Sequence, residues 1–150
     1  MAKKVVGPKA KAWESFSRWV KVRDCLATTG VPFVGVCITC NCRFHIRVLQ
    51  AGHCFPGRKN GRLFQKELVH AQCRMCNEGG HGKPKEYREA MDAQYTKVKV
   101  DAWEIEGGKV IHDRDMDFEG IEAKYKEKTN ALLKGLYGSY DDMLKGQAAW

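Results

Sequence analysis

The chain has 150 residues, the length of one compact domain with appended helices. Its 26 Lys and Arg residues exceed its 18 Asp and Glu residues, and the formal charge of +8 favours a polyanionic partner such as nucleic acid. No apolar run approaches the roughly 20 residues of a membrane span, and the first residues lack the apolar segment of a signal peptide. We therefore expect an intracellular protein without membrane contact, whose cysteines stay reduced.

The first part of the chain is predicted to be a basic tail followed by a helix. Residues 1–10 contain a Gly-Pro pair and form the expected flexible tail. From residue 10 to residue 29, aromatic and apolar side chains recur at helical spacing, with basic side chains on the other face. Gly30 and Pro32 are expected to end this helix, which would pack its aromatic stripe on the rest of the domain.

Short strands and a second helix are expected in the middle of the chain. Residues 31–36 are apolar and β-rich, residues 43–50 alternate in polarity as a strand does, and residues 64–71 form another short apolar stretch. Turn residues make 54–63 a predicted loop. Pro84 suits the first turn of a helix that reaches Tyr95.

The last third of the chain is predicted to be mostly helical. Residues 97–112 fit either a short helix or a hairpin, and the sequence leaves this choice open. Residues 118–144 form a long amphipathic helix, interrupted at Gly135 or Gly138 and capped by an aspartate just before it. This helix has two alternative roles, packing on the core or pairing with a second copy in a homodimer.

Two Cys-x-x-Cys pairs, separated by a few tens of residues, are typical of a zinc site. Each pair presents two thiolates on a tight turn, and four thiolates complete a tetrahedron that leaves no position for water. The expected ligands of this structural zinc are Cys37, Cys40, Cys73 and Cys76. Cys42 is a rival ligand because it follows Cys40 so closely, whereas Cys25 is read as an apolar helix position.

A histidine and an asparagine near these pairs are the candidate catalytic residues. Hydrolysis of a phosphodiester needs a general base for the attacking water, and His53 is the candidate for that role. Asn77 directly follows the last Cys and offers a carbonyl oxygen to a hard divalent ion such as Mg²⁺ or Mn²⁺, although Asn here also suits a helix cap. His70 is a further candidate ligand expected to face the site, and His81 is expected in an exposed loop.

The segment that carries these residues is strongly basic. Between Asp24 and Glu67 the chain has no carboxylate. Six basic side chains there are expected to contact DNA phosphates: Arg43, Arg47, Arg58, Lys59, Arg62 and Lys66.

At these residues the sequence resembles the NinG/Rap family of lambdoid-phage recombination proteins. The matching pieces span roughly residues 13–135 and include Trp19–Asp24, Cys37–Cys40, Gln50–His53, Val69–Asn77, Tyr87–Arg88 and Tyr125–Lys128. The resemblance implies a phage-encoded, structure-specific DNA endonuclease. Such an enzyme would act in the bacterial cytoplasm on branched recombination intermediates, namely D-loops and four-way (Holliday) junctions.

The core is also similar to phage endonuclease VII and other HNH nucleases. This resemblance implies a small α+β fold, in which a zinc-stapled ββα-metal, treble-clef-like core carries flanking N- and C-terminal helices. In those enzymes the residue matching His53 is the general base and the one matching Asn77 is a ligand of the catalytic metal. An Asp commonly precedes that His, but here Gly52 does, so His70 is the first candidate for the missing ligand.

The chain is accordingly divided into a basic tail (1–10), an HNH-like nuclease domain with its N-terminal helix (11–96) and a helical extension (97–150). The rival hypothesis is a non-catalytic zinc module that binds DNA or RNA without cleaving it. A third is an adaptor whose C-terminal helix binds another protein, which a neutral surface around His53 would favour; the segment is instead basic.

Overall fold

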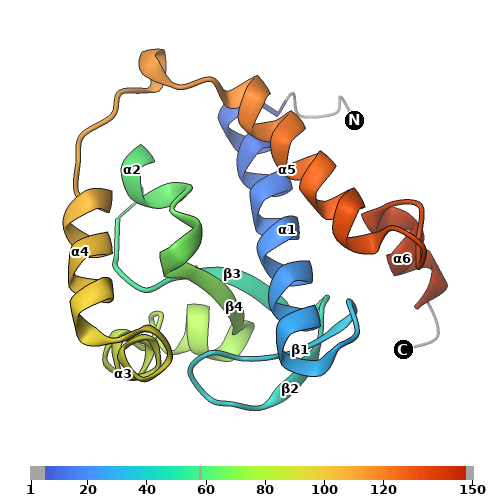
Figure 1. Cartoon of the computed structure of the whole chain (residues 1–150), viewed down its shortest axis with the longest axis horizontal. Coiled ribbons are helices and arrows are strands. Elements are labelled where there is room, and N and C mark those ends of the chain that lie inside the picture. The colour runs from blue at the N-terminus through green and yellow to red at the C-terminus, as the bar shows by residue number, and fades with distance from the viewer. Residues whose placement is uncertain (1–5, 58, 148–150) are drawn as a thin grey trace.

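The computed structural model describes residues 6–57 and 59–147, which form a small α+β structure (Figure 1). Its α-helices are α1 (Pro8–Thr29), α2 (Asn60–Leu63), α3 (Pro84–Tyr95), α4 (Lys97–Gly107), α5 (Phe118–Leu133) and α6 (Tyr140–Gly146). Its strands are β1 (Val34–Val36), β2 (Arg43–His45), β3 (Leu49–His53) and β4 (Val69–Cys73). Short 3-10 helices occupy Lys66–Leu68 and Asp113–Asp115, and a π-helix occupies Met75–Gly79. The expected α+β class is confirmed. No described helix is long and apolar enough to cross a membrane.

Helix α1 begins and ends at the residue types that the sequence offers for that purpose. It starts at Pro8, two residues earlier than predicted, because Gly7 before it is extended and proline is preorganised for the first helical position. Residues 8–10 are therefore helical, while residues 1–5 of the predicted tail lie outside the described range. Gly30 takes the left-handed conformation (φ 80°) and donates its N–H to the Leu26 carbonyl at 3.0 Å, which confirms it as the helix stop.

Two antiparallel pairs of strands, β1 with β2 and β3 with β4, carry the central segment. The single strand predicted over 43–50 is wrong, because the chain turns after β2: the Val48 N–H donates to the His45 carbonyl at 2.9 Å, and β3 begins at Leu49. The apolar stretch 64–71 also enters its strand late, since a 3-10 turn precedes Val69.

Capping side chains set the ends of the later helices. The segment left open at 97–112 begins with the helix α4, which ends at Gly107 and whose N-cap Thr96 accepts from the Lys99 N–H at 3.4 Å. Asp117 caps α5 by accepting from the Gly120 N–H at 3.0 Å, as an aspartate was expected to. The predicted long helix is two helices, α5 and α6, and Gly135 with a φ of 84° lies in the break.

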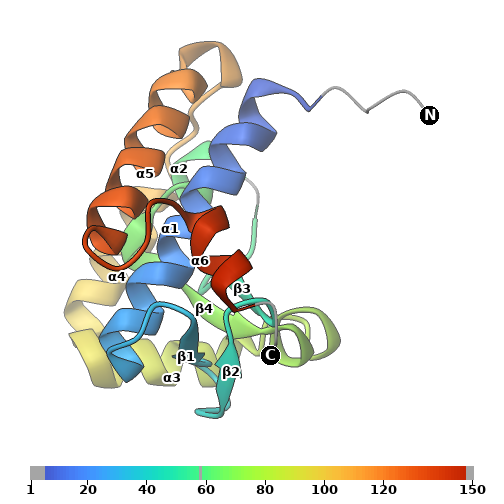
Figure 2. The ribbon, with the colours of Figure 1, turned by 90° about the vertical axis from the view of Figure 1, so that its right-hand side faces the viewer.

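The late helices pack on the core, which is the first of their two predicted roles. Figure 1 shows α5 running along α1, and between them the rings of Phe16 and Tyr125 meet edge to face with centroids 4.9 Å apart. Figure 2 shows the short α6 beyond α5, where it adds Tyr140 and Met143 to the cluster that surrounds the buried cysteines. Pairing with a second copy stays a prediction.

Candidate metal centre and active site

The four predicted zinc ligands come together where the two strand pairs meet. Cys37 follows β1, Cys40 ends the turn after it, Cys73 ends β4, and Cys76 lies in the π-helix. Their Sγ atoms all lie within 4.8 Å of one another, and those of Cys40 and Cys73 are 4.0 Å apart. A tetrahedral ion with Zn–S bonds of about 2.3 Å requires sulfur separations of about 3.8 Å, so the cluster fits zinc.

Hydrogen-bond donors around Cys37 favour its thiolate, which is the form of a cysteine that binds a metal ion. Cys37 Sγ accepts from the Cys73 N–H at 3.2 Å and lies 3.3 Å from the Thr39 hydroxyl. Burial disfavours its thiolate, but these donors outweigh burial and lower the pKa of Cys37 to about 6. The four thiols fill all four positions of a tetrahedral ion, so the site would hold the fold together rather than bind substrate.

The other cysteines do not join this cluster. Cys42, the rival ligand, is exposed, and its thiol points at the Cys40 carbonyl at 3.6 Å. Cys25 and Cys54 are buried among apolar side chains, and burial raises the pKa of each thiol to about 12. The structure therefore assigns the centre to the two Cys-x-x-Cys pairs.

His53 lies at the end of β3, on the wall of a cavity of about 1320 Å³. The cavity extends between α1, β3 and the segment 77–84. The His53 ring stacks on Trp13 of α1 at a centroid distance of 5.2 Å and an interplanar angle of 18°. Its Nε2 lies 3.2 Å from the Leu63 carbonyl oxygen, which can only accept a hydrogen bond. The contact selects the tautomer with the proton on Nε2 and the lone pair on Nδ1.

Asn77 reaches the same cavity from the π-helix that follows β4. Single turns of π-helix are rare in proteins as a whole. Those that occur are often found at functional sites. The Asn77 amide nitrogen donates to Gln50 Oε1 at 2.8 Å, and Gln50 is also on the cavity wall. The structure thus brings His53 and Asn77 to one cavity, although 23 residues separate them.

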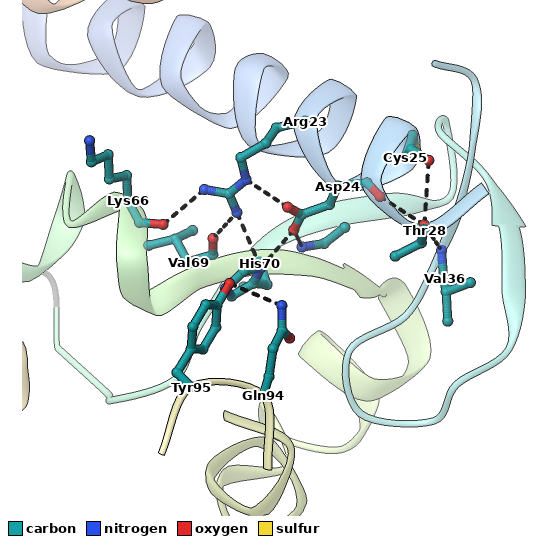
Figure 3. Close-up of polar contacts among 12 residues, drawn as sticks. Arg23, Asp24, Cys25, Thr28, Val36, Lys66, Val69, His70, Gln94 and Tyr95 are labelled. Carbon is teal, nitrogen blue, oxygen red and sulfur yellow. Dashed lines mark hydrogen bonds and ion pairs between the residues drawn. The ribbon is translucent and has the colours of Figure 1, made fainter. Parts of the chain in front are cut away.

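His70 does not line this cavity, contrary to the expectation that it faces the site. It is paired in β4 with Gly52, and its side chain points to the other side of the hairpin, toward the end of α1 (Figure 3). There its Nδ1 lies 3.0 Å from Asp24 Oδ2, and the ring stacks on Tyr95 at 5.9 Å. His70 is therefore part of the contact that holds α1 against β4.

The six predicted phosphate-binding residues have different environments. Arg47 donates to the Leu144 and Gln147 carbonyls at 2.8 and 3.2 Å, so its guanidinium holds the end of α6. Arg62 donates to the Pro56 carbonyl at 2.9 Å. Arg43, Arg47, Lys59 and Lys66 are exposed to solvent, Arg62 is half-buried, and Arg58 lies outside the described residues.

Other basic side chains line the cavity and were not among the predicted DNA contacts. Lys9, Trp13, Ser17 and Lys21 follow one another at every fourth position of α1 and share its cavity face. That i, i+4 ladder is visible in the sequence and was the available signal. His81 also lines the cavity, as an exposed residue in the loop where it was expected.

Comparison with known proteins identifies the family of the chain. The family model described as bacteriophage lambda NinG protein matches residues 4–135, which is most of the chain. The matched range includes the four cysteines of the cluster and every cavity-lining residue discussed above. Neither the curated proteins nor the solved structures contain a match to the chain.

Proposed function

Because the chain belongs to the family of the bacteriophage lambda NinG protein, we propose that it is a metal-dependent endonuclease that hydrolyses phosphodiesters in branched recombination intermediates such as four-way junctions and D-loops. The observation that carries this proposal is the meeting of His53 and Asn77 at one cavity beside a four-cysteine cluster. Phosphodiester hydrolysis needs a base for water and a charge-neutralising group for the leaving oxygen within a small space.

His53 is the proposed general base. With its Nε2 proton directed at the Leu63 carbonyl and its ring held against Trp13, the imidazole presents Nδ1 as the basic nitrogen. Nδ1 takes a proton from water as the water oxygen attacks phosphorus; the bond from phosphorus to the leaving oxygen breaks, and that oxygen is protonated from solvent. A bound Mg²⁺ or Mn²⁺, with Asn77 Oδ1 among its ligands, would neutralise the charge on the phosphate.

Lys9 and Lys21 on α1 supply positive charge to the same cavity. Lys9 already pairs with Asp113 at 2.9 Å, which leaves Lys21 as the stronger candidate for a phosphate contact. Burial, followed by the neighbouring Arg18, lowers the pKa of Lys21, and an approaching phosphate would favour its charged form. Contacts of this kind bind the backbone without reading bases, which suits an enzyme that recognises branches by shape.

The test is cleavage of a labelled four-way junction by the wild type, by His53→Ala and by His112→Ala, an exposed histidine outside the cavity. In Mg²⁺ or Mn²⁺ we expect cleavage by the wild type and by His112→Ala. We expect His53→Ala to bind the junction normally and to cut at least about 100-fold more slowly, the usual contribution of a general base. Equal rates for all three proteins would remove His53 from the mechanism. Salt-sensitive binding without any cleavage would favour the non-catalytic module.

A further inference from the structure

Gln72 in β4 carries a buried carbonyl oxygen that has no hydrogen-bond partner. The side chain is 0 % exposed, and its amide nitrogen donates to the Gly82 carbonyl at 2.8 Å and to the Thr39 hydroxyl at 3.2 Å. These contacts fix the orientation of the amide, because turning it over would place its oxygen against the Gly82 carbonyl oxygen. Among the described residues no donor reaches Gln72 Oε1, and an unpaired buried polar atom is costly enough to need an explanation.

The orientation of Asn77 is fixed by a chain of hydrogen bonds that starts at a carboxylate. Glu78 accepts from Arg74 at 2.9 Å and from the Gln50 amide nitrogen at 2.6 Å. Gln50 must therefore present its oxygen to Asn77, which in turn must present its nitrogen to Gln50. Asn77 Oδ1 is left pointing away from this chain, and no hydrogen bond within the described range involves it.

Both carbonyl oxygens border the same point, the bare Cα of Gly52 in β3. A Cβ at residue 52 would overlap Gln72 Oε1 and would lie 3.2 Å from Asn77 Oδ1. Tyr87 holds this backbone in place by donating its hydroxyl proton to the Gly52 carbonyl at 2.7 Å. Two oxygens of the same partial charge thus border the same small space beside Gly52, the residue before His53, and no donor among the described residues bonds to Gln72 Oε1 there.

We propose that Gln72 Oε1 and Asn77 Oδ1 are two protein ligands of a hard divalent cation, Mg²⁺ or Mn²⁺, bound beside Gly52, where Asn77 reaches the wall of the His53 cavity. Carbonyl oxygens are suitable ligands for such ions and poor ones for zinc, which the four thiolates take instead. Two neutral ligands leave most coordination positions to water and to phosphate oxygens, both of which Mg²⁺ keeps in the sites of phosphate-transferring enzymes. The assignment places Gln72 in the role that the sequence suggested for His70, and its catalytic meaning rests on the proposed nuclease function.

The test uses Mn²⁺ itself, titrated into the zinc-loaded full chain and followed by the electron paramagnetic resonance signal of free Mn²⁺. We expect one Mn²⁺ site, weakened roughly tenfold or more in Gln72→Met and in Asn77→Ala, and strengthened roughly tenfold in Gln72→Glu, which adds a charged oxygen at the same place. Gln65→Glu is the matched control, since Gln65 is also buried with an unpaired Oε1, but that oxygen borders Gly107 rather than Gly52 and Asn77.

Three outcomes would overturn the site. These are equal Mn²⁺ affinity in the wild type and Gln72→Met, no gain in Gln72→Glu, or an equal gain in Gln65→Glu. If Gln72→Met does not fold, Gln72→Glu and Asn77→Ala decide by themselves. The site and the nuclease can fail separately: Gln72-dependent Mn²⁺ binding without junction cleavage would leave the site and remove the enzyme. Junction cleavage together with Mn²⁺ binding that does not depend on Gln72 would remove the site and leave the enzyme.

Discussion

Asp24 on α1 and His70 on β4 are hydrogen-bonded, with Oδ2 and Nδ1 3.0 Å apart and both side chains at most 10 % exposed (Figure 3). The same Oδ2 accepts the Ala71 N–H at 2.7 Å, and Oδ1 accepts from Arg23 at 2.6 Å. The Arg23 guanidinium also donates to the Val69 carbonyl at 2.7 Å. One carboxylate therefore joins the first helix to the strand that supplies both Gln72 and Cys73.

Asp24→Asn should destabilise the protein by about 2–4 kcal/mol, because it removes the buried charge that His70 and Arg23 are arranged to meet. Burial alone would raise the pKa of Asp24, but the hydrogen bond from His70 and the charges of His70 and Arg23 outweigh it and lower the pKa below 3.8. The wild-type advantage in urea unfolding should thus shrink as the pH falls through and below 3.8, where the carboxylate becomes protonated. Asp141→Asn, at an exposed position, should change little; equal losses in both variants would contradict this account.

Cys73→Ser should lose zinc and the folded state together. Cys73 is 2 % exposed and its sulfur is shared by the metal cluster and the core around it, so no other side chain can replace it. Structural zinc is worth about 10–16 kcal/mol in small domains, more than the typical stability of a domain of this size. Zinc content and circular dichroism are the measurements. Cys42→Ser is the control and should keep both zinc and fold, whereas a folded, zinc-free Cys73→Ser protein would show that the cluster is not structural.

Thiol labelling should distinguish the three cysteines outside the cluster. Burial raises the pKa of Cys25 and Cys54 to about 12, so at pH 8 only about one in ten thousand of these thiols is ionised. Cys42 is exposed. The zinc-loaded protein should therefore react rapidly with one equivalent of an aromatic disulfide reagent, and Cys42→Ser with none. Fast reaction of more than one thiol in the zinc-loaded wild type, or of any thiol in Cys42→Ser, would contradict this account.

Local spacing predicted much of this structure. The Cys-x-x-Cys pairs specify their cluster because each pair needs only a tight turn, and the helix from Pro84 to Tyr95 has the predicted bounds because proline starts it. Gly30 and an aspartate before α5 likewise act on their own neighbours. Features of this kind depend on a few adjacent residues, and the sequence displays those residues directly.

The errors concern partners that are distant in the chain. His70 has a carboxylate at Asp24, 46 residues away, and no local pattern indicates that α1 would bring it there. Gln72 was overlooked although it lies in the stretch Val69–Asn77 that matches the family, because a glutamine has no role there by itself; its meaning depends on Gly52 and Asn77 meeting it in space. Periodicity also missed the turn that divides residues 43–50, since alternation persists through it.

Lys21→Gln should weaken junction binding by reducing its electrostatic part. Lys21 lines the cavity from α1, four residues after Ser17 and eight after Trp13, and is placed to meet a phosphate that approaches His53. Losing one phosphate contact should lower the slope of log K against log salt by about 0.9 for duplex DNA, with little dependence on sequence. Fluorescence anisotropy at several salt concentrations measures this. Arg47→Gln provides the contrast: its guanidinium holds the Leu144 and Gln147 carbonyls, so it should reduce stability and leave the salt slope unchanged. If Arg47→Gln lowers the slope and Lys21→Gln does not, DNA runs over the β2 side of the molecule and the cavity is not its path.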